Sequence, residues 1–141
     1  MKTCSGIIVL VSVFCSCATL RPPGDETLRT RAQEYAQQFI IVDTHVDVPY
    51  RLRDKMEDVS QRTAGGNFDY VRAKQGGLNA PFMSIYIPSD YEQKGGAKLL
   101  ADTLMDMVEK IARDSPDKFA IAKSAADVTA QFKQGKISFC M

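Results

Sequence analysis

The stretch Phe39 to Asp47 reads FIIVDTHVD, an apolar run that leads directly into an Asp-x-His-x-Asp motif. Four apolar residues are too few for a helix, and the run is rich in the β-branched residues that strands favour. We therefore predict a buried strand that continues through the motif to Val48, where Pro49 ends it.

The motif places polar side chains on one face of this strand. Asp43, His45 and Asp47 occupy alternate positions, so in a strand they point the same way. His45 and Asp47 lie about 6.5 to 7 Å apart at Cα, near enough to reach one divalent ion at about 2.0 to 2.2 Å. They also lie at the C-terminal end of this first strand, where α/β barrels carry their reactive groups. A hydrogen-bonded strand end is the alternative that the spacing alone leaves open.

The rest of the chain alternates helical and extended patterns. Apolar residues recur at helical spacing over two segments, and a third helix runs from a Ser124 cap to a Gly135 stop. A long polar loop separates the first two strands and contains one short helix near residues 51–59. The predicted helices are 26–38, 94–113 and 125–134; the predicted extended segments are 80–87, 119–122 and 137–141; the loop is 50–79.

Short apolar strands separated by amphipathic helices indicate a parallel sheet covered on both faces. A (β/α)8 barrel takes about 250 residues, so this chain would supply about half of one. The last predicted strand reaches the final residue, Met141. We therefore expect an α/β fold that is the N-terminal part of a (β/α)8 TIM-like barrel, and a truncated sequence.

The first 16 residues predict a secretory signal peptide. Lys2 gives a positive start, and the apolar run Gly6 to Phe14 is far shorter than the roughly 20 residues of a membrane-spanning helix. A buried N-terminal strand or helix is the alternative.

Residues 13–17 (VFCSC) resemble a bacterial lipobox, with cleavage before Cys17. Cys17 is then the expected lipid-attachment residue of an exported, membrane-anchored protein of the cell envelope. Plain secretion to a periplasmic or extracellular location stays open. Residues 17–25 follow as a tether, and residues 26–141 form the N-terminal half of the barrel domain.

Composition excludes some classes of partner. The chain has 18 Lys and Arg against 17 Asp and Glu, and no Trp. Without a basic excess or cluster, nucleic-acid binding has no electrostatic basis. Cys140 is the one cysteine outside the N-terminal 17 residues, so a disulfide framework is not expected and Cys140 is predicted to be structural.

Residues 42–52 (VDTHVDVPYRL) resemble the opening motif of the renal or membrane dipeptidase family, Asp-x-His-x-Asp-x-Pro. Residues 68–88 (FDYVRAKQGGLNAPFMSIYIP) are similar to that family's next block. Residues 99–141 share its layout: a long helix, an aromatic residue at Phe119, a Ser-Ala helix start, and Gly-Lys before a strand. Amidohydrolases of the phosphotriesterase type usually open with His-x-His, so Asp47 favours the dipeptidases.

This resemblance implies a barrel of the metal-dependent hydrolase type that holds two zinc ions. His45 and Asp47 would bind the first zinc, and Asp43 would orient the site without binding metal. A bridging glutamate is expected within a few residues after Met141, and two histidines later still, so no catalytic residue is expected within this chain. A metal-activated water would hydrolyse the peptide bond of a dipeptide, sometimes one with a D-residue at its C-terminal side.

Several alternatives stay open. Arg51, Arg53 and Arg72 could each meet a substrate carboxylate, although a solvated loop charge is the favoured interpretation. The 141 residues alone are expected to be inactive, with at most a weak single-metal site. A non-catalytic exported half-barrel or binding module, and a related amidohydrolase with other substrates, are the competing functions. A homodimer is neither indicated nor excluded.

Overall fold

The computed structural model describes residues 24–141; the predicted signal peptide, Cys17 and most of the tether lie outside the described residues. The described elements are α1 (Asp25–Gln38), β1 (Ile41–Val46), α2 (Val48–Asp54), α3 (Tyr70–Gly76), β2 (Leu78–Met83), α4 (Tyr91–Lys94), α5 (Ala97–Asp114), β3 (Phe119–Ile121), α6 (Ala125–Lys133) and β4 (Ile137–Phe139).

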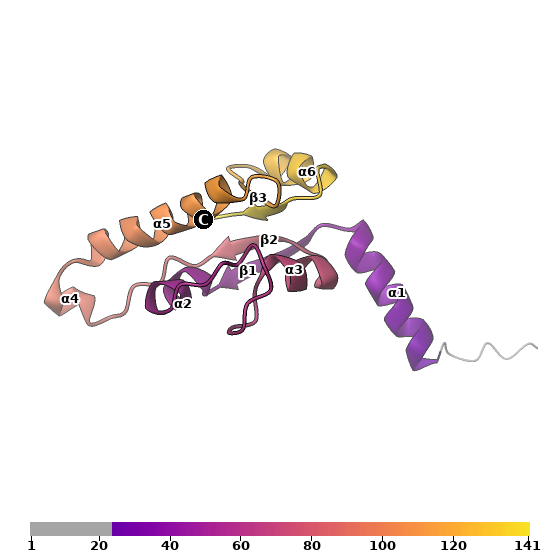
Figure 1. Cartoon of the computed structure of the whole chain (residues 1–141), viewed down its shortest axis with the longest axis horizontal. Helices are drawn as coiled ribbons and strands as arrows, with labels where there is room; N and C mark the ends of the chain where they lie inside the picture. Colours follow the sequence, from indigo (N-terminus) through magenta and orange to yellow (C-terminus); the bar gives the residue numbers. More distant parts are fainter. Residues whose placement is uncertain (1–23) are drawn as a thin grey trace, which may run out of the picture.

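The paired strands are parallel, as predicted. β1 pairs with β2, and β3 pairs with β4. The two pairs meet where Phe82 and Cys140 form a parallel bridge. There, the Cys140 N–H donates to the Pro81 carbonyl over 3.1 Å, and its carbonyl accepts from the Met83 N–H over 2.8 Å. The strands point the same way in Figure 1, so the chain leaves β1 and β2 at the same end of the molecule.

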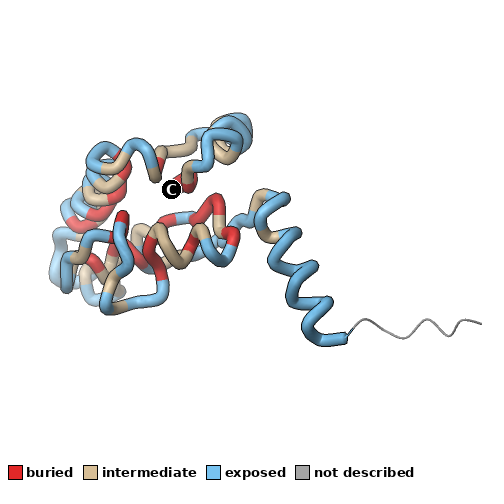
Figure 2. The backbone as a smooth tube through the Cα atoms, turned by 45° about the vertical axis from the view of Figure 1, so that its right-hand side comes forward, coloured by how far each residue is buried: buried red, intermediate tan, exposed pale blue. Residues whose placement is uncertain are grey.

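The core lies between α5, the β3–β4 pair and the segment that leads into α3. Phe119 and Phe139 stack with ring centroids 4.6 Å apart, and Phe68 and Tyr70 pack against them. Figure 2 shows the buried backbone gathered along α5 and the strands. One face of α5 supplies one side of this core through Val108 and Ala112, and Leu100 and Leu104 are buried on the same helix.

The predicted burial of the first strand is wrong within the described residues. No residue of β1 is buried, and Val42 keeps 49% of its surface exposed. β2 covers one edge of β1, but α1 runs away from the sheet instead of packing on it (Figure 1). The predicted amphipathic helix does form as α1, yet Leu28, Tyr35 and Phe39 on it and at its end are exposed. Among residues 24–141, the β1–β2 pair is therefore not covered on both faces.

The predicted loop over residues 50–79 is partly wrong. The one short helix expected in it, near residues 51–59, corresponds to α2, but the segment also contains α3. Pro49 lies in the first turn of α2, where a fixed φ and a missing N–H are tolerated. The first strand therefore ends at Val46 and not at Val48. The second strand begins at Leu78 and ends at Met83, before the predicted 80–87 segment is complete.

The helix predictions in the second half of the chain are confirmed with one change. Gly95 and Gly96 have φ of +74° and +82° and separate α4 from α5, so the long helix begins at Ala97. Ser124 caps α6 as predicted, since its Oγ accepts from the Asp127 N–H over 3.1 Å.

Gly77 brings α1 and α3 together. Its φ is +80°, and a Cβ there would lie 2.2 Å from the Ala36 carbonyl oxygen. We expect Gly77→Ala to lower the free energy of unfolding by about 2 kcal/mol in urea denaturation, because both the backbone conformation and the contact exclude a methyl group. Gly76→Ala is the matched control: a Cβ at Gly76 meets nothing within 4 Å, so this change should be neutral or stabilise α3 by up to about 1 kcal/mol. Equal losses of unfolding free energy in Gly77→Ala and Gly76→Ala would contradict the claim that Gly77 is required by its conformation and its contact with Ala36.

Candidate metal-binding site

The motif residues come together where β1 ends. Asp43 and His45 lie on β1, and Asp47 occupies the N-cap position of α2, one residue past the strand. The chain turns there, and His45 Nε2 lies 3.1 Å from Asp47 Oδ1. Both side chains are open to solvent, with 67% and 62% of their surface exposed. The prediction that Asp47 continues the strand is wrong, but the two side chains do converge.

Asp43 has a different environment from the other two. Its Oδ1 accepts a hydrogen bond from the His45 backbone N–H over 3.0 Å, so it braces the backbone that carries the imidazole. All three motif residues line one pocket of about 460 Å³, and Arg51, Gly66 and Phe68 are among the residues on its other walls. A volume of about 300 to 1,000 Å³ is usual for small-ligand sites.

The imidazole and carboxylate are hydrogen-bonded to each other, slightly closer together than two ligands of one zinc ion would be. Two ligands of one tetrahedral ion at about 2.0 to 2.2 Å lie about 3.3 to 3.6 Å apart, and the observed 3.1 Å between Nε2 and Oδ1 is close to this. Within residues 24–141, no group of three or more His, Cys, Asp or Glu is placed to hold an ion. The described residues therefore provide two donors, and a complete centre needs donors from outside them.

One wall of the pocket is held by an ion pair between Arg51 and Glu57. Arg51 Nη1 donates to Glu57 Oε2, and Glu57 Oε1 accepts from the Gly65 N–H over 3.2 Å. The hydrogen bond from Arg51 is the main reason that the pKa of the Glu57 carboxyl lies below its ordinary value. No motif in the sequence points to Glu57. The interpretation of Arg51 as a solvated loop charge is wrong, because Arg51 lies in α2 and is largely buried against Glu57.

Asp69 and Arg72 hold the other end of the same segment. The Asp69 side chain is fully buried and accepts from the Thr63 N–H (3.1 Å), the Arg72 N–H (2.8 Å) and Arg72 Nε (2.6 Å). Burial by itself would raise the pKa of Asp69, but the hydrogen bonds from Arg72 and Thr63 outweigh it and lower the pKa to about 2. Arg72 also donates to the Gly66 carbonyl over 2.6 Å. The favoured interpretation of Arg72 as a solvated charge is wrong, because its donors are used inside the fold.

Arg53 lies apart from the pocket. It pairs with Asp54 over 2.8 Å and sits over the Tyr50 ring, 4.2 Å from its centroid. Of the three arginines singled out in the sequence, only Arg51 lines the pocket that contains His45.

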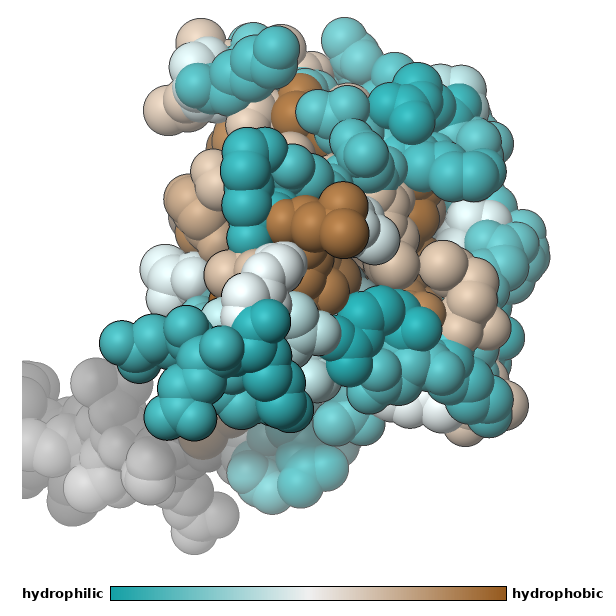
Figure 3. All heavy atoms as spheres, turned by 90° about the vertical axis from the view of Figure 1, so that its left-hand side faces the viewer, coloured by the Kyte–Doolittle hydropathy of each residue, from teal (hydrophilic) through white to brown (hydrophobic). Residues whose placement is uncertain are grey.

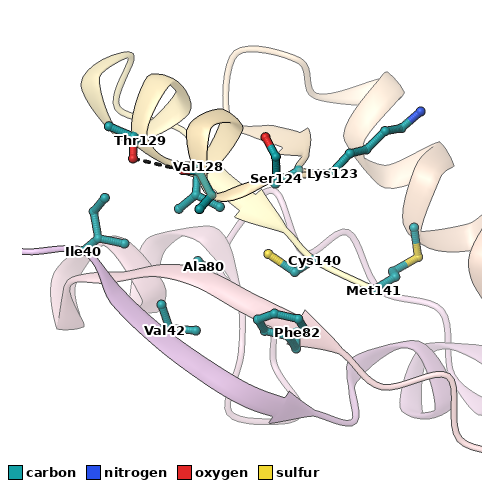
Figure 4. Close-up of a pocket in the computed structure, with 12 residues that line it drawn as sticks. Ile40, Val42, Ala80, Phe82, Lys123, Ser124, Val128, Thr129, Cys140 and Met141 are labelled. Atoms are coloured by element: carbon teal, nitrogen blue, oxygen red, sulfur yellow. Dashed lines mark hydrogen bonds between the residues drawn. The ribbon is translucent and has the colours of Figure 1, made fainter.

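A second pocket, of about 450 Å³, is lined mainly by apolar residues. It lies between α6 and the strands, where Val42, Phe82 and Cys140 face Val128 and Thr129 (Figure 4). Its lining contains no histidine, aspartate or glutamate. Burial raises the pKa of the Cys140 thiol, which agrees with a structural role.

Figure 3 shows hydrophobic side chains exposed between hydrophilic ones at the end of the molecule that carries α4.

A match to a protein family decides how the motif is interpreted. The family model for membrane dipeptidases (peptidase family M19) matches residues 29–141, most of the chain. The chain belongs to the membrane dipeptidase family. This confirms the resemblance noted in residues 42–52, 68–88 and 99–141.

Two curated relatives are dipeptidases. Dipeptidase ataJ of Aspergillus terreus is 31% identical over 120 residues, which are 77% of this chain and 29% of the relative. Dipeptidase 3 of Mus musculus is 28% identical over 99 residues, which are 67% of this chain and 20% of the relative. The chain therefore spans less than a third of the length of these two dipeptidases.

Two solved peptidase structures share the fold. The probable dipeptidase PvdM from Pseudomonas aeruginosa matches 82% of this chain and 30% of its own, with a TM-score of 0.65 and 17% identity. A metallopeptidase from Rhodobacter sphaeroides, bound to a phosphinate mimic of the dipeptide L-Ala-D-Ala, matches 72% of this chain and 36% of its own, with a TM-score of 0.61 and 21% identity. Over the described residues, the mixed α/β fold is thus that of this family. None of the helices in this part of the chain is long and apolar enough to cross a membrane.

Proposed function

We propose that this chain is the N-terminal part of an exported zinc dipeptidase with a (β/α)8 barrel, and that His45 and Asp47 bind the first of two zinc ions. The observation that carries the proposal is the approach of His45 Nε2 to Asp47 Oδ1 at the rim of a small-ligand pocket, in a chain of the membrane dipeptidase family.

The residues of the chain have separate roles in this proposal. His45 and Asp47 hold the metal, while Asp43 fixes the backbone of His45 through its 3.0 Å hydrogen bond. When bound, zinc supplies a water nucleophile at neutral pH and polarises the scissile carbonyl. A bridging glutamate and two histidines for the second zinc would follow Met141. The pocket would take a dipeptide, and the relative bound to a mimic of L-Ala-D-Ala supports one with a C-terminal D-residue.

The proposal includes the cellular location. A signal peptide over residues 1–16 and lipid attachment at Cys17 would place the protein in the cell envelope, with residues 17–25 as the tether. Several acyl chains give stable anchoring where one does not. The partners are then a dipeptide and a membrane surface, with no nucleic acid; a homodimer is compatible with this arrangement.

Zinc titration of the 141-residue chain, together with an assay for L-Ala-D-Ala hydrolysis, tests the proposal. Cys4, Cys15 and Cys17 should be replaced by serine, because thiolates are themselves zinc ligands. We expect one weakly bound zinc and no turnover, and turnover once the coding frame is extended through the expected glutamate and histidines. If the chain bound no zinc at all, the assignment of His45 and Asp47 as zinc ligands would be wrong. If the 141-residue chain bound two zinc ions tightly and hydrolysed the dipeptide, the proposal that it is only the N-terminal part of the enzyme would be wrong.

The described residues favour one second candidate, because they bring together only two metal donors. A non-catalytic exported module that keeps the half-barrel would show this same arrangement. Reading the coding sequence past codon 141 separates the two: a glutamate within a few codons and two later histidines support the dipeptidase, and a stop codon supports the module.

A further inference from the structure

Arg51 connects the metal-binding end of β1 to the opposite wall of the pocket. It lies one helical turn after Asp47, and its N–H donates to the Asp47 carbonyl over 3.3 Å. Its guanidinium reaches Glu57, which in turn accepts from the Gly65 N–H. Gly66 and Phe68, which follow directly, line the pocket together with His45.

Gly66 shows how closely the guanidinium fits this wall. A Cβ at Gly66 would lie 2.6 Å from both Cζ and Nε of Arg51, and Gly66 has a φ of +66°. Glycine suits this positive φ, and a Cβ there would have to displace the guanidinium from its place. The arginine is thus fixed on one side by the Glu57 carboxylate and on another by the backbone of the wall.

The ion pair is also shielded from solvent. The Arg51 and Glu57 side chains keep 27% and 13% of their surface exposed, unlike surface pairs, which contribute little. Arg51 Nη2 is covered and has no hydrogen-bond partner among the described residues. Burying a donor without a hydrogen-bond partner costs free energy. The contacts with Glu57 and with the backbone of residues 65–66 must offset this cost to hold the guanidinium in its buried position.

We propose that Arg51 is a positioning residue that clamps residues 63–68 as a wall of the His45–Asp47 pocket. Arg72 and Asp69 already brace this segment from the α3 side. Arg51 is the connection to α2, which begins directly after Asp47. The proposal rests on the proposed function only in treating this pocket as the dipeptide site.

Hydrogen exchange at the Gly65 amide tests the clamp in the full 141-residue chain. Arg51→Met removes the guanidinium and keeps the apolar stem; Glu57→Gln keeps the shape and removes the charge. We expect the Gly65 amide to exchange about tenfold faster in both, since it is released with the carboxylate that accepts from it. Arg53→Met is the matched control on the same helix and should leave the rate within about twofold. Unchanged Gly65 rates in both test variants would overturn the proposal.

A second measurement separates positioning from simple stabilisation. Co²⁺ takes the same ligands as zinc and is paramagnetic, so its effect on the amides of Asn67 and Phe68 reports their distance from His45. We expect these paramagnetic shifts to fall by more than half in Arg51→Met and to recover in part in Arg51→Lys, which keeps a charge for Glu57. Faster Gly65 exchange with unchanged shifts would overturn positioning.

Failure of the proposed function looks different. If Co²⁺ leaves the His45 resonances of the parent chain unshifted, the metal assignment is wrong. The Gly65 exchange rates then still decide the clamp, because they need no metal.

Discussion

Replacing Asp69 by alanine should lower the free energy of unfolding by about 4 kcal/mol. The carboxylate is fully buried and accepts four hydrogen bonds, two from Arg72 and two from Thr63. Its loss removes the N-cap of α3 and leaves a half-buried guanidinium without its charge partner. Breaking a buried pair in this way usually costs about 3 to 5 kcal/mol, and a lost cap about 1 kcal/mol. Urea denaturation at neutral pH measures the change.

Asp54→Ala is the control for this variant. Asp54 also pairs with an arginine, but 60% of its side chain is exposed, so its loss should change stability by no more than about 0.5 kcal/mol. Similar losses in Asp54→Ala and Asp69→Ala would show that burial of the pair contributes nothing.

The same carboxylate gives a pH dependence of known sign. The pKa of Asp69 is lowered from its ordinary 3.8 to about 2 in the fold, so the folded protein holds the ionised form more strongly than the unfolded chain. The stabilisation is complete above pH 3.8 and is lost as the pH falls through about 2, by on the order of 2 kcal/mol. Other carboxyls titrate here too. The difference in acid sensitivity between the parent and Asp69→Ala therefore isolates this group.

The sequence contained the signals for α3, although the loop prediction overlooked them. Asp69 is a good N-cap residue, its side chain accepting from the N–H three residues later, and Gly77 is a typical left-handed C-cap. They bracket a seven-residue helix that is too short to show a hydrophobic period. The two capping residues predict α3 even though it is too short for its hydrophobic period to be recognised.

Burial of β1 could not be predicted from its own residues. An apolar run such as residues 39–42 shows that the strand has apolar surface to bury. Whether that surface is buried depends on which other elements pack over it. The same holds for α1. Leu28 and Tyr35 have the spacing of an amphipathic helix, but they are exposed, because no surface among the described residues packs against them. Strand identity and direction were predictable because they follow from local pattern and order along the chain.

The candidate site divides in the same way. The Asp-x-His-x-Asp spacing was enough to bring His45 and Asp47 together, even though the strand ends between them. The clamp on the opposite wall was not predictable, because Arg51 meets Glu57 only after the chain has left α2 and folded back. Pairings that depend on the path of a loop leave no periodic trace in the sequence.

Replacing His45 by alanine should abolish zinc binding by the 141-residue chain, with a fall in affinity of at least about 100-fold. Nε2 is one of the two donors that the described residues bring together, and a single carboxylate is a poor zinc site. Calorimetric or chelator-competition titration measures this in a tag-free chain with Cys4, Cys15 and Cys17 replaced by serine. Asp47→Asn should show a loss of similar size, because it weakens the other donor.

Asp43→Asn separates ligand from support. Asp43 bonds to the His45 backbone and not to its ring, so its change should weaken zinc binding by only about tenfold, as is usual for groups that orient a ligand. A loss as large as that of His45→Ala would make Asp43 a direct ligand, with a rotated side chain in the metal-bound form. If all three variants bind zinc like the parent, the ion lies elsewhere, and the pairing of His45 with Asp47 is only the hydrogen bond that closes the turn after β1.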